Sequence, residues 1–325
     1  IRRDHRAVAM WVSDRSRAIR FVLLLLPACA GSPLGAYKQP AGWEEGARAF
    51  SKFCALPAVP PSGRLSIEVA GVTRDFELVL PSGYNGLKRF PVLFAWHGTS
   101  SSGDEFLDRY YGAISDGAAG RALIVAPDGL VEHEGEWAGM TRWQLSNFDG
   151  AFFDQLLDKL NREYCIDPAR VFSTGHSIGA YFTNYLGCTR GTRLRAIAPI
   201  AGGGPLDTSD CVGHPAVLIG HNPAECATVS PPKCPFAVPW ADTGWISTQF
   251  WAERNGCDDP GAMPTAPYKG EPPCRALAGC DPDAPVTLCL YDYESMFAGP
   301  HAWPTPWMAR MIVDSFLRLP ASGND

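Results

Sequence analysis

The chain has 325 residues, of which 46% are hydrophobic, and a formal net charge of −6. This composition can build one sizeable core, and the negative charge argues against a nucleic acid or an anionic membrane as a partner. No repeat of fixed period, phosphate-binding loop or paired Cys-x-x-Cys motif occurs. The segment His133-Glu134-Gly135-Glu136 lacks a second histidine at helical spacing, so we interpret it as a solvated loop and expect no metal and no organic cofactor.

The first 29 residues have the features of a targeting segment. Basic residues up to Arg20 precede the apolar run 21–26, which is too short to span a bilayer. The run ends in Leu-Pro-Ala-Cys29, which is similar to the lipobox of bacterial lipoproteins. We therefore expect a signal peptide over residues 1–29, with either a lipid anchor at Cys29 or ordinary cleavage nearby, and a secreted or cell-surface bacterial protein.

Residues 30–61 are rich in Pro, Gly and Ala and predict a tether, followed by one folded domain over 62–325. In that domain, apolar strands alternate with amphipathic helices. The expected strands are 65–70, 74–80, 90–96, 122–126, 170–174, 195–200, 215–220 and 286–292. The expected helices are 104–116, 147–163, 178–188, 243–255 and 305–318. This alternation predicts the α/β class, with a mostly parallel sheet covered by helices on both faces.

The strand 170–174 and the helix 178–188 are joined by Gly175-His176-Ser177-Ile178-Gly179. The order strand, sharp turn and helix around a G-x-S-x-G sequence is that of a nucleophile elbow. Its two glycines allow close backbone approach, while the serine hydroxyl stays exposed on the turn. We predict Ser177 as a nucleophile.

A general base for Ser177 is expected later in the chain, where only His214, His221 and His301 occur. His301 lies between the last expected strand and the last expected helix, so we predict it as the base. His97 comes before the serine, and we expect it to pin its own loop by hydrogen bonding.

The acid that would orient His301 is expected in the loop after strand 215–220. Glu225 is our choice, because a Glu carboxylate can accept the second imidazole N–H and fix the tautomer. Asp242 is the runner-up, and Asp258 or Asp259 are further candidates. Each of these carboxylates could equally be a solvated loop charge.

The loop after strand 90–96 begins His97-Gly98-Thr99. Backbone amides of Thr99 and Ile178 are expected to form an oxyanion hole. We predict substrate binding by His176 and by tryptophans at the rim of the site. The tryptophan candidates are Trp137, Trp143, Trp240, Trp303 and Trp307. Trp303 and Trp307 could instead pack the last helix.

The chain contains 11 cysteines, and setting Cys29 aside leaves ten, an even number in a chain with an export signal. We predict disulfides rather than metal thiolates, with the pairing open. Cys226 and Cys234 could close a small loop beside the acid. Cross-links around the weakly periodic segment 258–285 would hold a rim of the site in place.

Together, the elbow, the His-Gly loop, Glu225 and the segment Gly299-Pro300-His301-Ala302-Trp303-Pro304 resemble the family that joins feruloyl esterases, acetyl xylan esterases and polyhydroxybutyrate depolymerase-like enzymes. The similarity runs from about Leu65 to Leu319. It departs at the acid, where the family pattern His-Gly-Thr-x-Asp is replaced by His221-Asn-Pro-Ala-Glu225.

The resemblance implies an α/β-hydrolase fold and a serine esterase that works through an acyl-enzyme. We separately expect a monomer. It favours feruloyl or acetyl esters of plant cell-wall polysaccharide as substrates, with a small-molecule, short-chain or polyester ester as the alternative. A non-catalytic surface binding protein on a hydrolase scaffold, or a peptidase of the same fold, are hypotheses from other classes.

Overall fold

A computed structural model of the chain describes residues 54–108, 114–118, 120–135, 137–205, 207–223, 244–261, 264, 266–292, 301, 303 and 307–321. The expected signal peptide, Cys29 and most of the expected tether lie outside these residues. None of the described helices is long and apolar enough to cross a bilayer.

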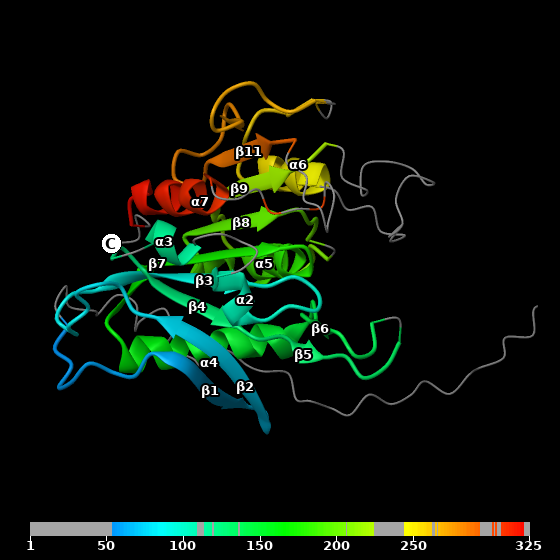
Figure 1. Cartoon of the computed structure of the whole chain (residues 1–325). Helices are drawn as coiled ribbons and strands as arrows, with labels where there is room; N and C mark the ends of the chain where they lie inside the picture. Colours follow the sequence, from blue (N-terminus) through cyan, green and yellow to red (C-terminus); the bar gives the residue numbers. More distant parts are fainter. Residues whose placement is uncertain are drawn as a thin grey trace, which may run out of the picture. The chain divides into compact units, whose positions relative to one another are not determined.

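The described strands form a nine-stranded sheet and a separate two-stranded hairpin (Figure 1). The strands of the sheet are β1 (Gly63–Val69), β2 (Val72–Val79), β3 (Phe90–Trp96), β4 (Leu123–Pro127), β7 (Ile166–His176), β8 (Ala196–Ile200), β9 (Ala216–His221), β10 (Cys274–Ala276) and β11 (Val286–Leu290). The hairpin is β5 (Leu130–Val131) and β6 (Thr141–Arg142).

The sheet order is β1-β2-β4-β3-β7-β8-β9-β11-β10. Strands β4, β3, β7, β8, β9 and β11 run parallel, while β1, β2 and β10 pair antiparallel at the edges. Every residue of β3, β4, β8 and β9 is buried, as expected for parallel strands covered on both faces. The predicted α/β class is confirmed.

Six α-helices are described: α2 (Gly103–Asp108), α3 (Ile114–Ala118), α4 (Asn147–Glu163), α5 (Ile178–Thr189), α6 (Gly244–Arg254) and α7 (Trp307–Arg318). Where a single helix is expected over 104–116, the structure describes helix at both ends, in α2 and α3, and residues 109–113 lie outside the described part. A 3₁₀ turn, Gly191–Arg193, follows α5.

Alternate side chains of β3 divide the core into two layers. Phe94 and Trp96 pack with Phe153 of α4 and Phe182 of α5, in the cluster that also contains side chains of α6. The neighbouring side chains of β3 face the cluster formed with α2, α3 and α7. Helices α4, α5 and α6 thus cover one face and α2, α3 and α7 the other (Figure 1).

The chain from Cys54 onward is fixed to this domain. A disulfide joins Cys54 to Cys165 at the start of β7, and the Tyr164 hydroxyl donates to the Pro61 carbonyl at 2.7 Å. Residues 54–61, the last part of the expected tether, are thus held to the folded unit, and the tether over the residues before them stays a prediction. The pairing of Cys54 with Cys165, which is 111 residues away, could not be predicted from the sequence.

Three further disulfides occur in the described part, Cys188–Cys211, Cys257–Cys280 and Cys274–Cys289. The last two cross-link the weakly periodic segment after α6 to itself and to β11. This confirms the expectation of disulfides there. Cys226 and Cys234 lie outside the described residues.

Candidate active site

Ser177 stands between β7 and α5 in a strained backbone conformation. Its φ is 55° and its ψ is −123°, in a region that residues with a side chain rarely adopt. The Ser177 amide donates to the Ile200 carbonyl of β8 at 3.2 Å, and the Ser177 carbonyl accepts from Ala180 at 2.9 Å. Strain of this kind persists only where the surroundings fix it, and it is concentrated at functional sites.

The two glycines of the motif are required by contacts that leave no room for a side chain. A Cβ on Gly175 would lie 2.3 Å from the Gly179 carbonyl oxygen. A Cβ on Gly179 would lie 2.1 Å from the carbonyl oxygen of Trp96, at the end of β3. The elbow is therefore packed directly against the loop that follows β3, which carries the other expected half of the site.

His301 lies beside Ser177 in the structure, although 124 positions separate them in the sequence. Its Nε2 lies 2.8 Å from the Ser177 Oγ, within hydrogen-bond distance. The His176 ring is 7% exposed, and its centroid is 5.0 Å from that of His301. The structure thus brings together the serine and the histidine that the sequence selected, with a second imidazole beside them.

His97 is fully buried and holds two loops together. Its Nδ1 donates to the Gly98 carbonyl at 2.7 Å, and its Nε2 accepts from the Gly129 amide at 2.8 Å. Burial lowers the pKa of His97, which favours the neutral ring that this pair of hydrogen bonds requires. These contacts fit the structural role expected for this histidine.

Thr99 lies in the loop that His97 pins, and Ile178 is the first residue of α5. The Ser100 amide donates to the Thr141 carbonyl at 2.9 Å, which ties this loop to the β5–β6 hairpin. The first amides of a helix have no partner within the helix, so the Ile178 amide is suited to bind an anion. The loop and the helix start lie at the same edge of the sheet because Gly179 contacts the end of β3.

The two leading candidates for the acid of the site, Glu225 and Asp242, lie outside the described residues. The further candidates Asp258 and Asp259 are exposed, and the Asp259 carboxylate accepts from the Gly261 amide at 2.8 Å in a local turn. The two described carboxylates therefore behave as loop residues.

The tryptophans expected at the rim occupy different environments. Trp143 is fully buried and its Nε1 donates to the His97 carbonyl at 3.0 Å, so a rim position for it is wrong. Trp303 is 3% exposed and packs on Phe106 of α2, which favours the packing alternative. Trp307 is half-buried beside Tyr291, and Trp240 lies outside the described residues.

Trp137, on the β5–β6 hairpin, keeps a partly exposed ring. The Arg142 guanidinium lies 5.2 Å from the ring centroid, a cation–π distance. Of the candidate aromatic residues that the structure describes, Trp137 has the surroundings that best fit a surface contact with a ligand.

The loop after β8 supports the elbow from below, a role that was not predicted from the sequence. A Cβ on Gly202, in the loop after β8, would lie 2.7 Å from the Ser177 carbonyl oxygen. The run Gly202-Gly203-Gly204 was the available signal. This loop is anchored by Asn184 of α5, whose Nδ2 donates to the Gly203 carbonyl at 2.8 Å.

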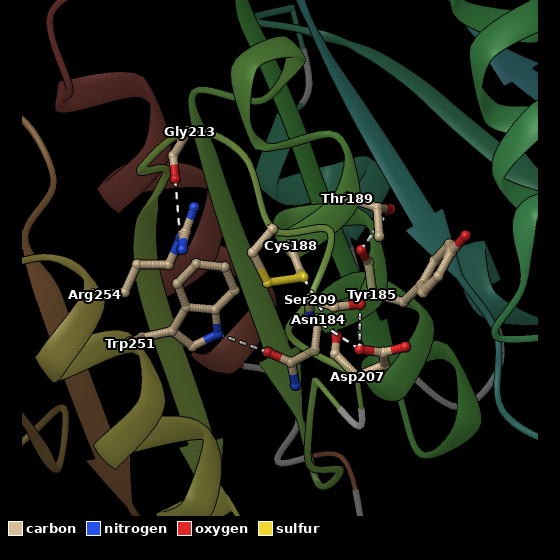
Figure 2. The surroundings of a disulfide bond; sticks show 10 residues. Asn184, Tyr185, Cys188, Thr189, Asp207, Ser209, Gly213, Trp251 and Arg254 are labelled. Atoms are coloured by element: carbon tan, nitrogen blue, oxygen red, sulfur yellow. Dashed lines mark hydrogen bonds between the residues drawn. A yellow bond between two sulfur atoms is a disulfide. The ribbon is translucent and has the colours of Figure 1, made fainter. Parts of the chain in front are cut away.

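Asn184 also accepts at Oδ1 from the Trp251 indole of α6 at 2.8 Å, and Cys188 one turn further along α5 is in a disulfide (Figure 2). Its partner Cys211 belongs to the segment between β8 and β9. The disulfide and the Asn184–Gly203 hydrogen bond tie that segment to α5, the helix that directly follows Ser177. Among the described residues, no group of three His, Cys, Asp or Glu side chains is placed to hold a metal ion.

The sheet order, the elbow between β7 and α5 and the position of His301 before α7 define the α/β-hydrolase fold. Comparison with known proteins agrees with this. The crystal structure of an acetyl xylan esterase from Aspergillus awamori superimposes with a TM-score of 0.50 at 12% identity, over 75% of this chain and 94% of that one.

In sequence, the chain is 29% identical over 208 residues to feruloyl esterase D of Neurospora crassa, a match that covers 61% of this chain and 64% of that protein. It is 27% identical over 225 residues to feruloyl esterase C of Emericella nidulans, covering 67% of this chain and 75% of that protein. The match thus spans just under two thirds of the Neurospora protein. No family model matches. The predicted resemblance is confirmed, and the chain is a relative of feruloyl esterases C and D.

Proposed function

We propose that the protein is a serine hydrolase of carboxylic esters. The observation that carries the proposal is the 2.8 Å separation of His301 Nε2 and Ser177 Oγ at a strained elbow. A histidine at this distance can take the hydroxyl proton as the oxygen attacks, which is how a weak serine nucleophile is activated.

In the proposed mechanism, the Ser177 oxygen adds to the ester carbonyl while its proton moves to His301 Nε2. The amides of Thr99 and Ile178 stabilise the negative charge that develops on the carbonyl oxygen. His301 then returns the proton to the leaving alcohol, and an acyl-enzyme remains. A water molecule, deprotonated by His301, resolves the acyl-enzyme and regenerates the Ser177 hydroxyl.

Glu225 is proposed to orient His301, with Asp242 as the runner-up. A carboxylate in this role holds the imidazole tautomer and stabilises the imidazolium, so its loss lowers the turnover rate less than loss of the serine. We expect Glu225→Gln to lower turnover strongly and Asp242→Asn to leave it near the wild-type rate. The reverse pattern would assign the role to Asp242.

The proposed substrates are feruloyl or acetyl esters of plant cell-wall polysaccharide. The relatives are named feruloyl esterases, and the partly exposed Trp137 is suited to stack on an aromatic acyl group or a sugar ring. His176, whose ring centroid lies 5.0 Å from that of His301, is kept as a proposed contact, whereas the buried Trp303, also predicted as a contact, is assigned to packing on α2. Polyester or short-chain esters are the alternative class, and a non-catalytic binding protein is the alternative outside enzymes.

Export is part of the proposal, because four disulfides among the described residues are typical of proteins from oxidising compartments. The signal peptide over residues 1–29 and the monomeric state remain predictions. A bacterial lipid anchor at Cys29 has no support from the relatives, which come from Neurospora and Emericella.

The function is tested by measuring ferulate release from methyl ferulate beside hydrolysis of p-nitrophenyl acetate, with Ser177→Ala as the blank. Serine-dependent release from both supports a feruloyl esterase. Cleavage of the acetate alone moves the substrate toward acetylated sugars or short polyesters. Cleavage of neither, together with no labelling of Ser177 by a fluorophosphonate, would favour the binding protein.

A further inference from the structure

A basic cavity lies at the end of the sheet opposite Ser177. It has a volume of about 270 Å³, and four of its described lining residues are cations, namely Lys88, Arg89, Arg121 and Arg170. Arg170 precedes Ser177 by seven residues along β7, so the two sites are about 23 Å apart at the rise of an extended strand.

The cations converge because of the sheet topology. Lys88 and Arg89 lead into β3, Arg121 leads into β4, and Arg170 lies near the start of β7. These three strands are neighbours in the order β4-β3-β7 and run parallel, so their amino ends meet at one edge. The side chains come from three separate parts of the sequence, so the cluster forms only when the sheet is assembled.

Two of the guanidinium groups are held by backbone carbonyls. Arg89 donates to the Ile166 carbonyl at 2.7 Å, and Arg170 donates to the Leu317 carbonyl near the end of α7 at 3.0 Å. The Nε of Arg170 is buried and has no hydrogen-bond partner in the described part of the chain. An ordered guanidinium loses little further conformational freedom when it binds an anion.

The other two cations lie nearer to solvent. Arg121 pairs with Asp314 at 2.7 Å, and its side chain is 43% exposed. The Lys88 ammonium lies 5.1 Å from the centroid of the Phe90 ring, which also lines the cavity. Both side chains line the cavity, so a ligand bound there can contact them.

The charge of the cavity contrasts with that of the chain. The net charge is −6, yet none of the described lining residues is acidic. Asp314, which pairs with Arg121, does not line the cavity, and the α7 carbonyl that Arg170 binds contributes only a partial negative charge. Like charges gathered in a concave surface focus a positive potential there, which attracts anions.

We propose that this cavity binds the carboxylate or phosphate group of a small anionic ligand. Guanidinium groups match the paired oxygens of both anions, and Phe90 with Leu317 provides an apolar wall for an attached ring. The volume of about 270 Å³ is just below the usual range for sites that hold drug-sized molecules, so it suits free phosphate or one acidic sugar unit. This proposal does not depend on the esterase function.

The test is isothermal titration of the whole protein with three probes, sodium phosphate, trigalacturonate and neutral xylotriose. The cavity variant is Lys88→Gln with Arg121→Gln, and the control variant is Lys159→Gln with Arg162→Gln, which removes the same charge from the surface of α4. We expect saturable binding of phosphate, trigalacturonate or both. The Kd should rise about tenfold or more in the cavity variant and stay unchanged in the control.

Binding of phosphate alone would identify a free phosphate site, and binding of trigalacturonate alone a site for an acidic saccharide. Equal affinity in both variants, or no saturable binding of either anion, would overturn the proposal. Lys88→Gln alone serves as a second variant if the double variant is unstable. Hydrolysis of p-nitrophenyl acetate should be unaffected by the cavity variant, and the titration remains decisive if the protein hydrolyses no ester.

Discussion

The substitution Gly179→Ala tests whether the contact between the elbow and β3 sets the geometry of the site. A Cβ at this position would lie 2.1 Å from the Trp96 carbonyl oxygen, whereas real Cβ contacts do not fall below 3.0 Å. The start of α5 or the end of β3 must therefore move by at least 0.9 Å, the difference between these distances.

This movement falls on the groups proposed for catalysis. The shifted turn carries the Ile178 amide and follows Ser177 directly, and a misplacement of about 1 Å can lower a rate about 100-fold. The strain costs roughly 1–3 kcal/mol of stability, partly offset by about 1 kcal/mol from the better helix propensity of Ala. We expect kcat to fall about 100-fold, with a drop in Tm of only a few degrees.

Gly187→Ala in the same helix is the matched control. Its Cβ would meet the terminal Cδ1 of Ile197 at 2.6 Å, a flexible contact, and the position lies about 15 Å along α5 from Ser177. It should lower Tm comparably and leave kcat near the wild-type value. Both variants are compared by p-nitrophenyl acetate kinetics and thermal unfolding. Wild-type kcat in Gly179→Ala, or equal losses of kcat in both variants, would refute the reasoning.

Two further predictions concern stability. The pKa of buried His97 lies below its usual value of 6.5, so the unfolded chain binds a proton that the folded chain does not as the pH falls below 6.5. Tm should therefore decrease from pH 6.5 downward, and His97→Gln should flatten this part of the profile; an unchanged slope would contradict it. The Cys54–Cys165 disulfide spans 111 residues and Cys188–Cys211 spans 23. In the chain-entropy description, replacing the first pair by Ser should cost about 1.4 kcal/mol more than replacing the second in urea unfolding, and a reversed order would refute that description here.

The sheet and its order along the chain could be predicted because buried parallel strands appear as continuous apolar runs. The start of β7 was misplaced, since it begins at Ile166 rather than at residue 170. Pro168 lies in between and cannot donate to the strand ladder, and the pairing with β3 is irregular there. The β5–β6 hairpin escaped prediction because two-residue strands are too short to show a periodicity.

The burial of individual aromatic residues was the property hardest to predict from the sequence. Trp143 stands beside short polar segments and looked like a rim residue, yet its indole donates to the His97 carbonyl inside the core. The sequence shows that a tryptophan is present but not which surface it covers, because that depends on where β3, α5 and the hairpin meet. Trp303 was left open for the same reason, and its packing on Phe106 joins α2 to the segment before α7.

The three proposed catalytic groups differ in how strongly the sequence constrains them. Ser177 can be identified from a five-residue motif, because nearby backbone atoms leave no room for a side chain at either glycine of that motif. His301 is fixed by chain order, because few histidines follow the serine and only one lies between the last strand and the last helix. The acid has neither constraint, for a carboxylate anywhere in the long segment after β9 could satisfy the imidazole. Local sterics and element order thus identify the nucleophile and the base, while the acid must be assigned by the kinetics of Glu225→Gln against Asp242→Asn.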